Sequence, residues 1–201
     1  MPRGRPREFD RDKALRAALC LFWERGYQGA SISALTAAMG IGGPSLYAAF
    51  GSKAKLFQEA ADLYVAEEAG EPTRRLAAGD TARASVEAML RSNADLFTRD
   101  GEPAGCMLTR SASTCPGDDP EIQDYLDASV EQRLRAVEIR LERGAADGEA
   151  LPCHEPRALA EYFDAVVEGM AVRSMEGASR ASLHRIVDLT MRIWDTGEGA
   201  C

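Results

Sequence analysis

Apolar residues recur at intervals of three and four along nearly the whole chain, which is the spacing of amphipathic helices. The first such face, near the N-terminus, carries Leu15, Ala18, Leu19 and Phe22. Gly26 is expected to end this helix, because glycine readily adopts the backbone conformation of a helix stop. Strand-like alternation is absent from the sequence, and Ala, Leu, Arg and Glu, which favour helices, dominate it. The pattern therefore predicts an all-α protein.

Three short helices are predicted in succession near the N-terminus. Ser31 can cap a second helix that runs to Met39, and Gly40 is expected to end it. Gly42-Gly43-Pro44 then opens a third helix that reaches Phe50, since proline is well tolerated in a first turn. Three helices with a tight glycine-containing turn between the second and the third match the helix-turn-helix pattern, whose third helix enters the major groove of DNA.

The remainder of the chain is also predicted to be helical. A junction is expected at residues 70–80, where Gly70-Glu71-Pro72 and Gly79-Asp80 interrupt the pattern, and loops are expected at 100–105 and 144–156. The predicted helices cover about 53–69, 81–99, 106–114, 119–144, 157–176 and 179–195. We assign residues 1–55 to the helix-turn-helix domain with a basic N-terminal arm, and residues 56–201 to a second, helical domain.

The charge of the chain is distributed very unevenly. Residues 1–55 hold nine basic and four acidic residues, a net charge of +5, whereas the remainder holds 15 basic and 28 acidic residues, a net charge of −13. Such an asymmetry suggests that the first part meets a polyanion. No apolar run approaches the roughly 18 residues that a membrane span needs, and the basic start of the chain is not followed by an apolar signal core. We therefore expect a cytoplasmic protein with no membrane partner.

Residues suited to catalysis or metal binding are few. The five cysteines are irregularly spaced and form no C-x-x-C pair, so the sequence predicts neither a disulfide framework nor a metal site. The two histidines, His154 and His184, have no nucleophile or ligand at recognisable spacing. We therefore expect no enzyme activity and no cofactor.

The N-terminal segment resembles the DNA-binding domain of TetR-family regulators over about 45 residues. The resemblance is carried by Ala14 to Phe22, Glu24 to Tyr27, Ser31 to Leu35, Gly40-Ile41, Ser45-Leu46-Tyr47 and Phe50 to Lys53. It implies an all-α homodimer whose last two helices form an intersubunit four-helix bundle, and a ligand cavity between the middle helices. It thus gives the C-terminal helical domain a role in ligand binding and dimerisation. The implied function is a transcriptional regulator that represses from a palindromic operator on double-stranded DNA until a small molecule, of unknown identity, releases it.

The resemblance also implies which residues face DNA. The recognition helix would be Gly43 to Ala49, with Tyr47 and Lys53 on phosphates and Ser31 facing the backbone. Two alternatives stay open, in which Tyr47 is a core aromatic and Lys53 is merely a solvated lysine. Many relatives place Lys or bulky residues where this chain has the small or apolar residues Gly43, Pro44, Ala48 and Ala49. This helix is therefore expected to form few hydrogen bonds to base edges, with Ser45 as the donor. Apolar contacts from Pro44 or Ala48 to thymine methyl groups would take their place.

The arm Arg3-Gly4-Arg5-Pro6-Arg7 can compensate for a bare recognition helix. An extended segment of this kind fits a narrow, A·T-rich minor groove, whose negative potential attracts the guanidinium groups of Arg3, Arg5 and Arg7. The alternative is a basic tail that adds only non-specific charge.

The ligand-binding residues are less well specified. The middle helices carry apolar residues interspersed with polar ones, which is the composition of a ligand cavity. The candidates are Met89, Asn93, Phe97, Met107, Tyr125, Ser129, Phe163 and Met170. Each of them is equally compatible with a place in an ordinary core.

Two alternative functions remain open on the same scaffold. The first is a thiol-based regulator that responds to oxidants or electrophiles, with Cys106 as the sensor at a helix start, Arg110 beside it and Cys115 as a resolving thiol. The second is a regulator that acts through a protein partner and has lost DNA binding.

Overall fold

The computed structural model describes residues 9–114, 119–152 and 155–195, and these ranges hold helices and no strand. The helices are α1 (Arg11–Gly29), α2 (Ile32–Met39), α3 (Gly43–Phe50), α4 (Lys53–Glu67), α5 (Gly70–Ala78), α6 (Ala82–Phe97), α7 (Met107–Thr114), α8 (Pro120–Ala146), α9 (Pro156–Met175) and α10 (Arg180–Thr190), followed by a 3-10 turn (Met191–Asp195). The prediction of an all-α fold is confirmed.

The predicted helix boundaries in the first three helices are confirmed as well. Gly26 has φ +67° and interrupts α1, so the regular helix ends there and only a further turn follows. Ser31 caps α2 by accepting a hydrogen bond from the Ala34 N–H, and Gly40 ends α2 in the left-handed conformation. These short-range signals act within one turn, and the sequence alone therefore locates them.

The prediction that residues 70–80 interrupt the helical pattern is wrong, because Gly70–Ala78 forms helix α5. Pro72 lies in the first turn of α5, where its missing N–H has no partner to lose. Leu76 is buried and packs this helix against the core. Gly79 lies at the C-terminal end of α5, and α6 begins three residues later.

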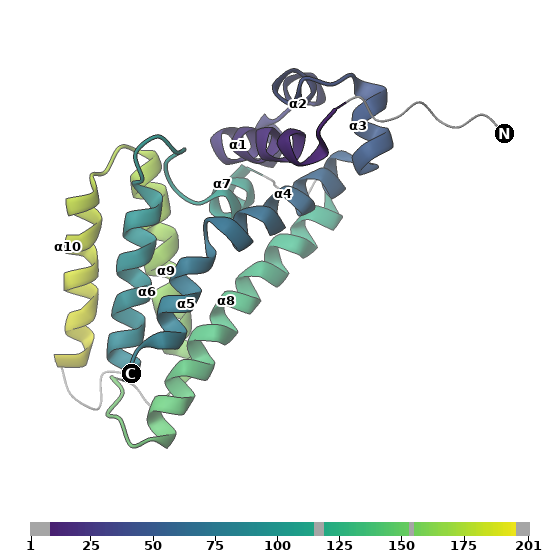
Figure 1. Cartoon of the computed structure of the whole chain (residues 1–201). Helices are drawn as coiled ribbons and strands as arrows, with labels where there is room; N and C mark the ends of the chain where they lie inside the picture. Colours follow the sequence, from purple (N-terminus) through teal and green to yellow (C-terminus); the bar gives the residue numbers. More distant parts are fainter. Residues whose placement is uncertain (1–8, 115–118, 153–154, 196–201) are drawn as a thin grey trace.

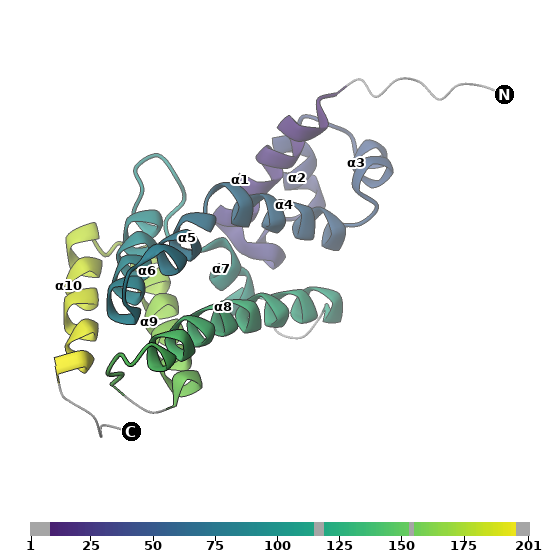
Figure 2. The ribbon, with the colours of Figure 1, turned by 60° about the horizontal axis from the view of Figure 1, so that its bottom comes forward.

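Helices α1 to α3 form a small unit at one end of the molecule, and α4 leads from it toward the remaining helices (Figure 1). Helix α8 is the longest, and its N-terminal end lies close to α4 in both views (Figure 2). Helices α6, α9 and α10 pack beside one another at the other end. Buried apolar residues of both ends belong to one continuous core. No described helix has the length and apolar character required to span a bilayer.

The helix-turn-helix unit is anchored to the second half of the chain by Trp23. This side chain is buried, and its Nε1–H donates to the carbonyl oxygen of Gly105 at 2.8 Å. Gly105 has φ +83°, and a Cβ there would lie 2.6 Å from Met175 Cγ of α9. The anchor therefore needs glycine at this position for two reasons, the backbone conformation and the close approach of α9.

Candidate DNA-binding face and ligand cavity

The outward face of α3 presents four of the ten residues predicted to contact DNA. Pro44, Ser45, Tyr47 and Ala48 are exposed, whereas Leu46 and Phe50 on the opposite face are buried. The Tyr47 side chain is 50% exposed, which excludes the alternative that it is a core aromatic. The arrangement is therefore a short helix held on the core by one face with its other face open to a groove.

Helix α3 is fixed in place by an arginine of α1 that the sequence did not single out. The Arg11 guanidinium lies 4.4 Å from the centroid of the Phe50 ring. The same group forms an ion pair with Glu59 of α4 at 2.7 Å. Arg11 of α1 thus connects the end of α3 to α4, a role that only the tertiary contacts identify.

Lys53 lies at the first turn of α4 and is half-buried. Its ammonium group is 4.2 Å from the centroid of the Tyr27 ring, while the Tyr27 hydroxyl donates to Asp119 Oδ2 at 2.6 Å. The position of Lys53 is therefore set by a contact with the core, and not by solvent alone.

The remaining predicted DNA contacts are Ser31, Gly43 and the three arginines of the arm. Ser31 is exposed at the start of α2, where its hydroxyl accepts from Ala34 N–H at 3.1 Å. Gly43 is partly exposed at the start of α3. Arg3, Arg5 and Arg7 lie outside the described residues.

A cavity of about 670 Å³ lies among helices α4 to α9 and includes five of the eight predicted ligand-binding residues. Those in its lining are Met89, Asn93, Phe97, Tyr125 and Ser129. The structure places Met107, Phe163 and Met170 elsewhere, fully buried in the core. Phe163, for example, stacks on Trp194 with ring centroids 5.4 Å apart, so its side chain packs toward the end of the chain.

The lining also contains residues that the sequence did not indicate. One of them is Leu76 of helix α5. The sequence does not indicate it as a lining residue, because the pattern predicts a junction in this segment. Arg133 of α8 follows Tyr125 and Ser129 at spacings of eight and four residues, so it continues the same helical face. This spacing is the feature of the sequence that could have identified Arg133 as a lining residue.

Charged groups of the lining form pairs within the protein. Arg133 lies 3.1 Å from Asp164 and 3.3 Å from Glu168 of α9. Burial lowers the pKa of Arg133, but the nearby negative groups, Asp164 above all, outweigh it and raise this pKa, so the guanidinium stays charged. The Tyr125 hydroxyl donates to Asp62 at 2.7 Å, and burial together with this bond raises the pKa of Tyr125.

Cys106, the candidate sensor, is partly buried, lines the cavity and directly precedes α7. Arg110 follows Cys106 and lies within α7, and its Nη2 donates to the carbonyl oxygen of Ala104 at 3.0 Å. Cys115 lies outside the described residues. Among the residues that are described, no three His, Cys, Asp or Glu side chains gather in a group that could hold a metal ion.

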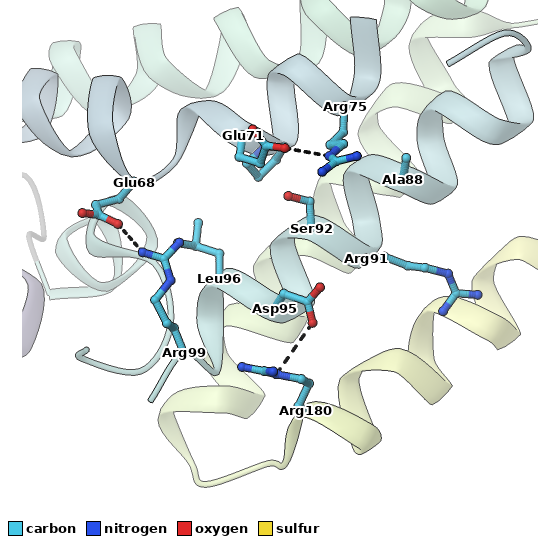
Figure 3. Close-up of a pocket in the computed structure, with 11 residues that line it drawn as sticks. Glu68, Glu71, Arg75, Ala88, Arg91, Ser92, Asp95, Leu96, Arg99 and Arg180 are labelled. Carbon is cyan, nitrogen blue, oxygen red and sulfur yellow. Dashed lines mark hydrogen bonds and ion pairs between the residues drawn. The ribbon is translucent and has the colours of Figure 1, made fainter. Parts of the chain in front are cut away.

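A second hollow, of about 430 Å³, lies on the surface between α5, α6 and the start of α10 (Figure 3). Ion pairs surround it: Arg99 with Glu68, Arg75 with Glu71 at 2.7 Å, and Arg180 with Asp95 at 3.7 Å. Each of these arginines already pairs with a carboxylate, and exposed pairs of this kind contribute little free energy individually. We attribute this hollow to the packing of the helices around it.

Family models match both halves of the chain. Residues 14–60 match the model described as bacterial regulatory proteins, tetR family. Residues 82–189 match the model described as the C-terminal domain of tetracyclin repressor-like proteins.

Individual relatives agree with the family models. The HTH-type transcriptional repressor ComR of Escherichia coli is 34% identical over 96% of this chain and 92% of ComR. The repressor BdcR of the same organism is 31% identical over 88% of this chain and 84% of BdcR. A cysteine mutant of the TetR family transcriptional regulator CifR, solved with 26-base-pair operator DNA, is 38% identical, with a TM-score of 0.89 over 94% of this chain and 100% of CifR. These relatives support a repressor that binds operator DNA, and they do not favour the thiol-based alternative that used Cys106.

Proposed function

The chain belongs to the TetR family of bacterial regulatory proteins, and from this premise we propose that it is a repressor that binds a pseudo-palindromic operator as a homodimer. A small molecule that occupies the cavity releases it from DNA. The observation that carries the proposal is the exposed face of α3 with Lys53 beside it. Its action is in the cytoplasm, where it meets operator DNA.

The direct test is to select binding sites from a random duplex library and to footprint the selected sequences. We expect two inverted half-sites whose centres lie roughly 34–36 Å apart, one helical turn, or a multiple of that distance. A folded protein that enriches no sequence would contradict the proposal and would favour the alternative in which it acts through a protein partner.

Deletion of residues 1–7 is expected to reduce the slope of log affinity against log salt by about 2 to 3, because three arginines no longer displace counterions. A triple variant in which Arg3, Arg5 and Arg7 become Lys separates the two interpretations of the arm. If the arginines lie in a minor groove, this variant keeps the salt slope and loses the preference for A·T-rich flanks. If both properties are unchanged in the lysine variant, the arm is only a basic tail.

Helices α9 and α10 are proposed as the dimer interface. They leave apolar side chains exposed, among them Leu189 at 65% and Tyr162 at 41% of their surfaces. We expect Leu189→Arg to convert the dimer into a monomer at micromolar concentration, because the charge would be buried in an isologous interface. Light scattering measures the mass, with Arg143→Ala on α8 as a control that stays dimeric. A wild-type protein that is strictly monomeric would refute the interface altogether.

A row of aromatic rings supports the idea that the cavity and the DNA-binding face are coupled. Tyr125 of the cavity wall meets Phe57 edge to face, with ring centroids 6.2 Å apart. Phe57 meets Tyr27 in the same way at 5.3 Å, and Tyr27 carries the Lys53 ammonium on its face. Displacement of Tyr125 by a ligand is thereby linked to the position of Lys53 through direct contacts.

Removing the Tyr125 ring is expected to weaken operator binding, although this residue lies in the cavity wall. Because an edge-to-face contact contributes about 1 kcal/mol, Tyr125→Ala should raise the operator Kd by roughly fivefold. Ser129→Ala, one helical turn further along α8 in the same wall, is the matched control and should change Kd less than about twofold. Fluorescence anisotropy with labelled operator measures both, and equal effects of the two variants would contradict the coupling.

A further inference from the structure

We propose that the ligand of this cavity is an uncharged and mostly apolar molecule, which excludes organic anions and cations as the natural signal. The inference rests on the proposed function, since it names the chemical class of the molecule that releases the repressor. A cavity of about 670 Å³ has the size that drug-like ligands occupy.

Most of the lining is apolar and comes from several helices. Helices α4 to α6 contribute Val65, Leu76 and Leu96. Helices α8 and α9 contribute Val137 and Val167. Binding energy in such a site comes mainly from the removal of apolar ligand surface from water.

The charged groups of the lining already have partners of opposite charge or hydrogen-bond donors. Among the described lining residues, the charged ones are Asp62, Arg74, Arg133 and Asp164. Asp62 accepts from the Tyr125 hydroxyl, Arg74 pairs with Glu71 at 2.9 Å, and Arg133 pairs with Asp164. The two negative and two positive side chains therefore leave no excess charge for a ligand to neutralise.

Replacing these internal pairs by pairs with a ligand would be unfavourable. An anion bound to Arg133 would have to compete with Asp164, whose side chain is only 13% exposed and would lose its cation. A cation bound to Asp164 would displace Arg133 in the same manner. A buried charge that loses its partner costs far more than the new pair returns, so ionic ligands are selected against.

One polar side chain can orient an uncharged ligand. Asn93 lies in the lining among apolar neighbours, and its Nδ2–H donates to the carbonyl oxygen of Met89 at 3.0 Å. The amide oxygen can then accept a hydrogen bond from a hydroxyl or amide group of the ligand. A small number of polar groups of this kind fixes the orientation of a ligand in an apolar site.

The test compares three competitors that differ only in the charge of their head group. The neutral fluorescent probe N-phenyl-1-naphthylamine is bound to the full-length protein at pH 7.5 and displaced by 1-decanol, decanoate or decylammonium below their aggregation concentrations. We expect decanol to displace the probe at a concentration at least tenfold lower than either ion. Equal or better competition by decanoate or by decylammonium would overturn the inference.

Variants show whether the probe is in the cavity. Ala136→Trp on α8 places an indole in the lining and is expected to lower probe affinity at least tenfold, and Ala77→Trp on α5 gives an independent second blockage. Ala145→Trp, on α8 but outside the lining, is the matched control and should bind the probe as wild type does. Circular dichroism confirms that each variant is folded. Probe binding that survives both cavity variants would overturn the inference.

Operator binding measured on the same preparations separates this inference from the proposed function. A protein that binds operator but none of the neutral compounds overturns the ligand class and leaves the repressor function intact. If the protein binds decanol in the cavity but binds no operator, the ligand class is supported and the repressor function is contradicted.

Discussion

Alanine at both Tyr47 and Lys53 is expected to lower operator affinity by roughly 100-fold or more, on all DNA sequences alike. Both residues are proposed to contact phosphates, Tyr47 from the exposed face of α3 and Lys53 from the first turn of α4. A hydrogen bond to a charged group contributes about 1.5–3 kcal/mol, which is about tenfold or more in affinity for each contact. Because phosphates carry no sequence information, discrimination between operator and non-operator DNA should change little.

Anisotropy titrations at several salt concentrations measure this effect together with the loss in salt slope, which should be about 1 for Lys53. Arg143→Ala removes one positive charge near the C-terminal end of α8, where the side chain is 73% exposed, and should leave the affinity within about twofold. Tyr47→Phe isolates the contribution of the hydroxyl. Since Lys53 also lies on the Tyr27 ring, the double variant must melt at nearly the wild-type temperature. Unchanged operator affinity in a folded double variant would remove both residues from the DNA-binding face.

The helix-turn-helix unit could be predicted from the sequence because its boundaries depend on short-range interactions. Ser31 and Gly40 act on backbone groups within one helical turn of themselves. Gly26, although enclosed in a longer helical segment, still takes the positive φ that its residue type favours. Such signals are present in the order of the residues and need no tertiary information.

The ligand cavity could be predicted only in part because it depends on which helix faces meet. Glycine and proline at 70–72 indicate a break in the helical pattern, yet proline is compatible with the first turn of α5, and this helix forms part of the cavity lining. Met107, Phe163 and Met170 have the right chemistry for a lining but face the core. An apolar residue on an inward face cannot reveal from its own helix whether the opposite surface is packed or empty.

Long-range polar contacts could not be predicted from the sequence for a related reason. Arg11 and Glu59 are separated by 48 residues, and Trp23 and Gly105 by 82. No periodicity connects residues at such separations, since their pairing follows from the packing of the elements that carry them. These contacts nevertheless determine where the recognition helix lies relative to the cavity.

The largest effect on stability is expected at Arg140, a buried residue of α8. Its Nε–H donates to Ser85 Oγ at 2.8 Å, and its Nη2 donates to the carbonyl oxygen of Gly79 at 3.3 Å. Glu149, 3.7 Å from the same Nη2, accepts from the N–H of Ala82 at the start of α6. One guanidinium therefore connects α8 to the turn between α5 and α6 and to the segment that follows α8.

Arg140→Ala is expected to lower the free energy of unfolding by about 3 kcal/mol, because it takes the cation away from the Glu149 carboxylate and removes the guanidinium donor to Ser85 Oγ and the Gly79 carbonyl in a mostly buried site. For a chain of this length that corresponds to a fall in Tm of roughly 6–12 °C. The matched control is Arg143→Ala, three residues further along α8, whose exposed ion pair with Asp147 at 3.7 Å should contribute less than about 1 kcal/mol.

The double variant Arg140→Met with Glu149→Gln tests the cause, since removing both charges should recover part of the loss in stability. Thermal and urea unfolding at one fixed protein concentration measure all four proteins. A fall in Tm no larger for Arg140→Ala than for Arg143→Ala would show that the buried guanidinium does not stabilise this junction of helices.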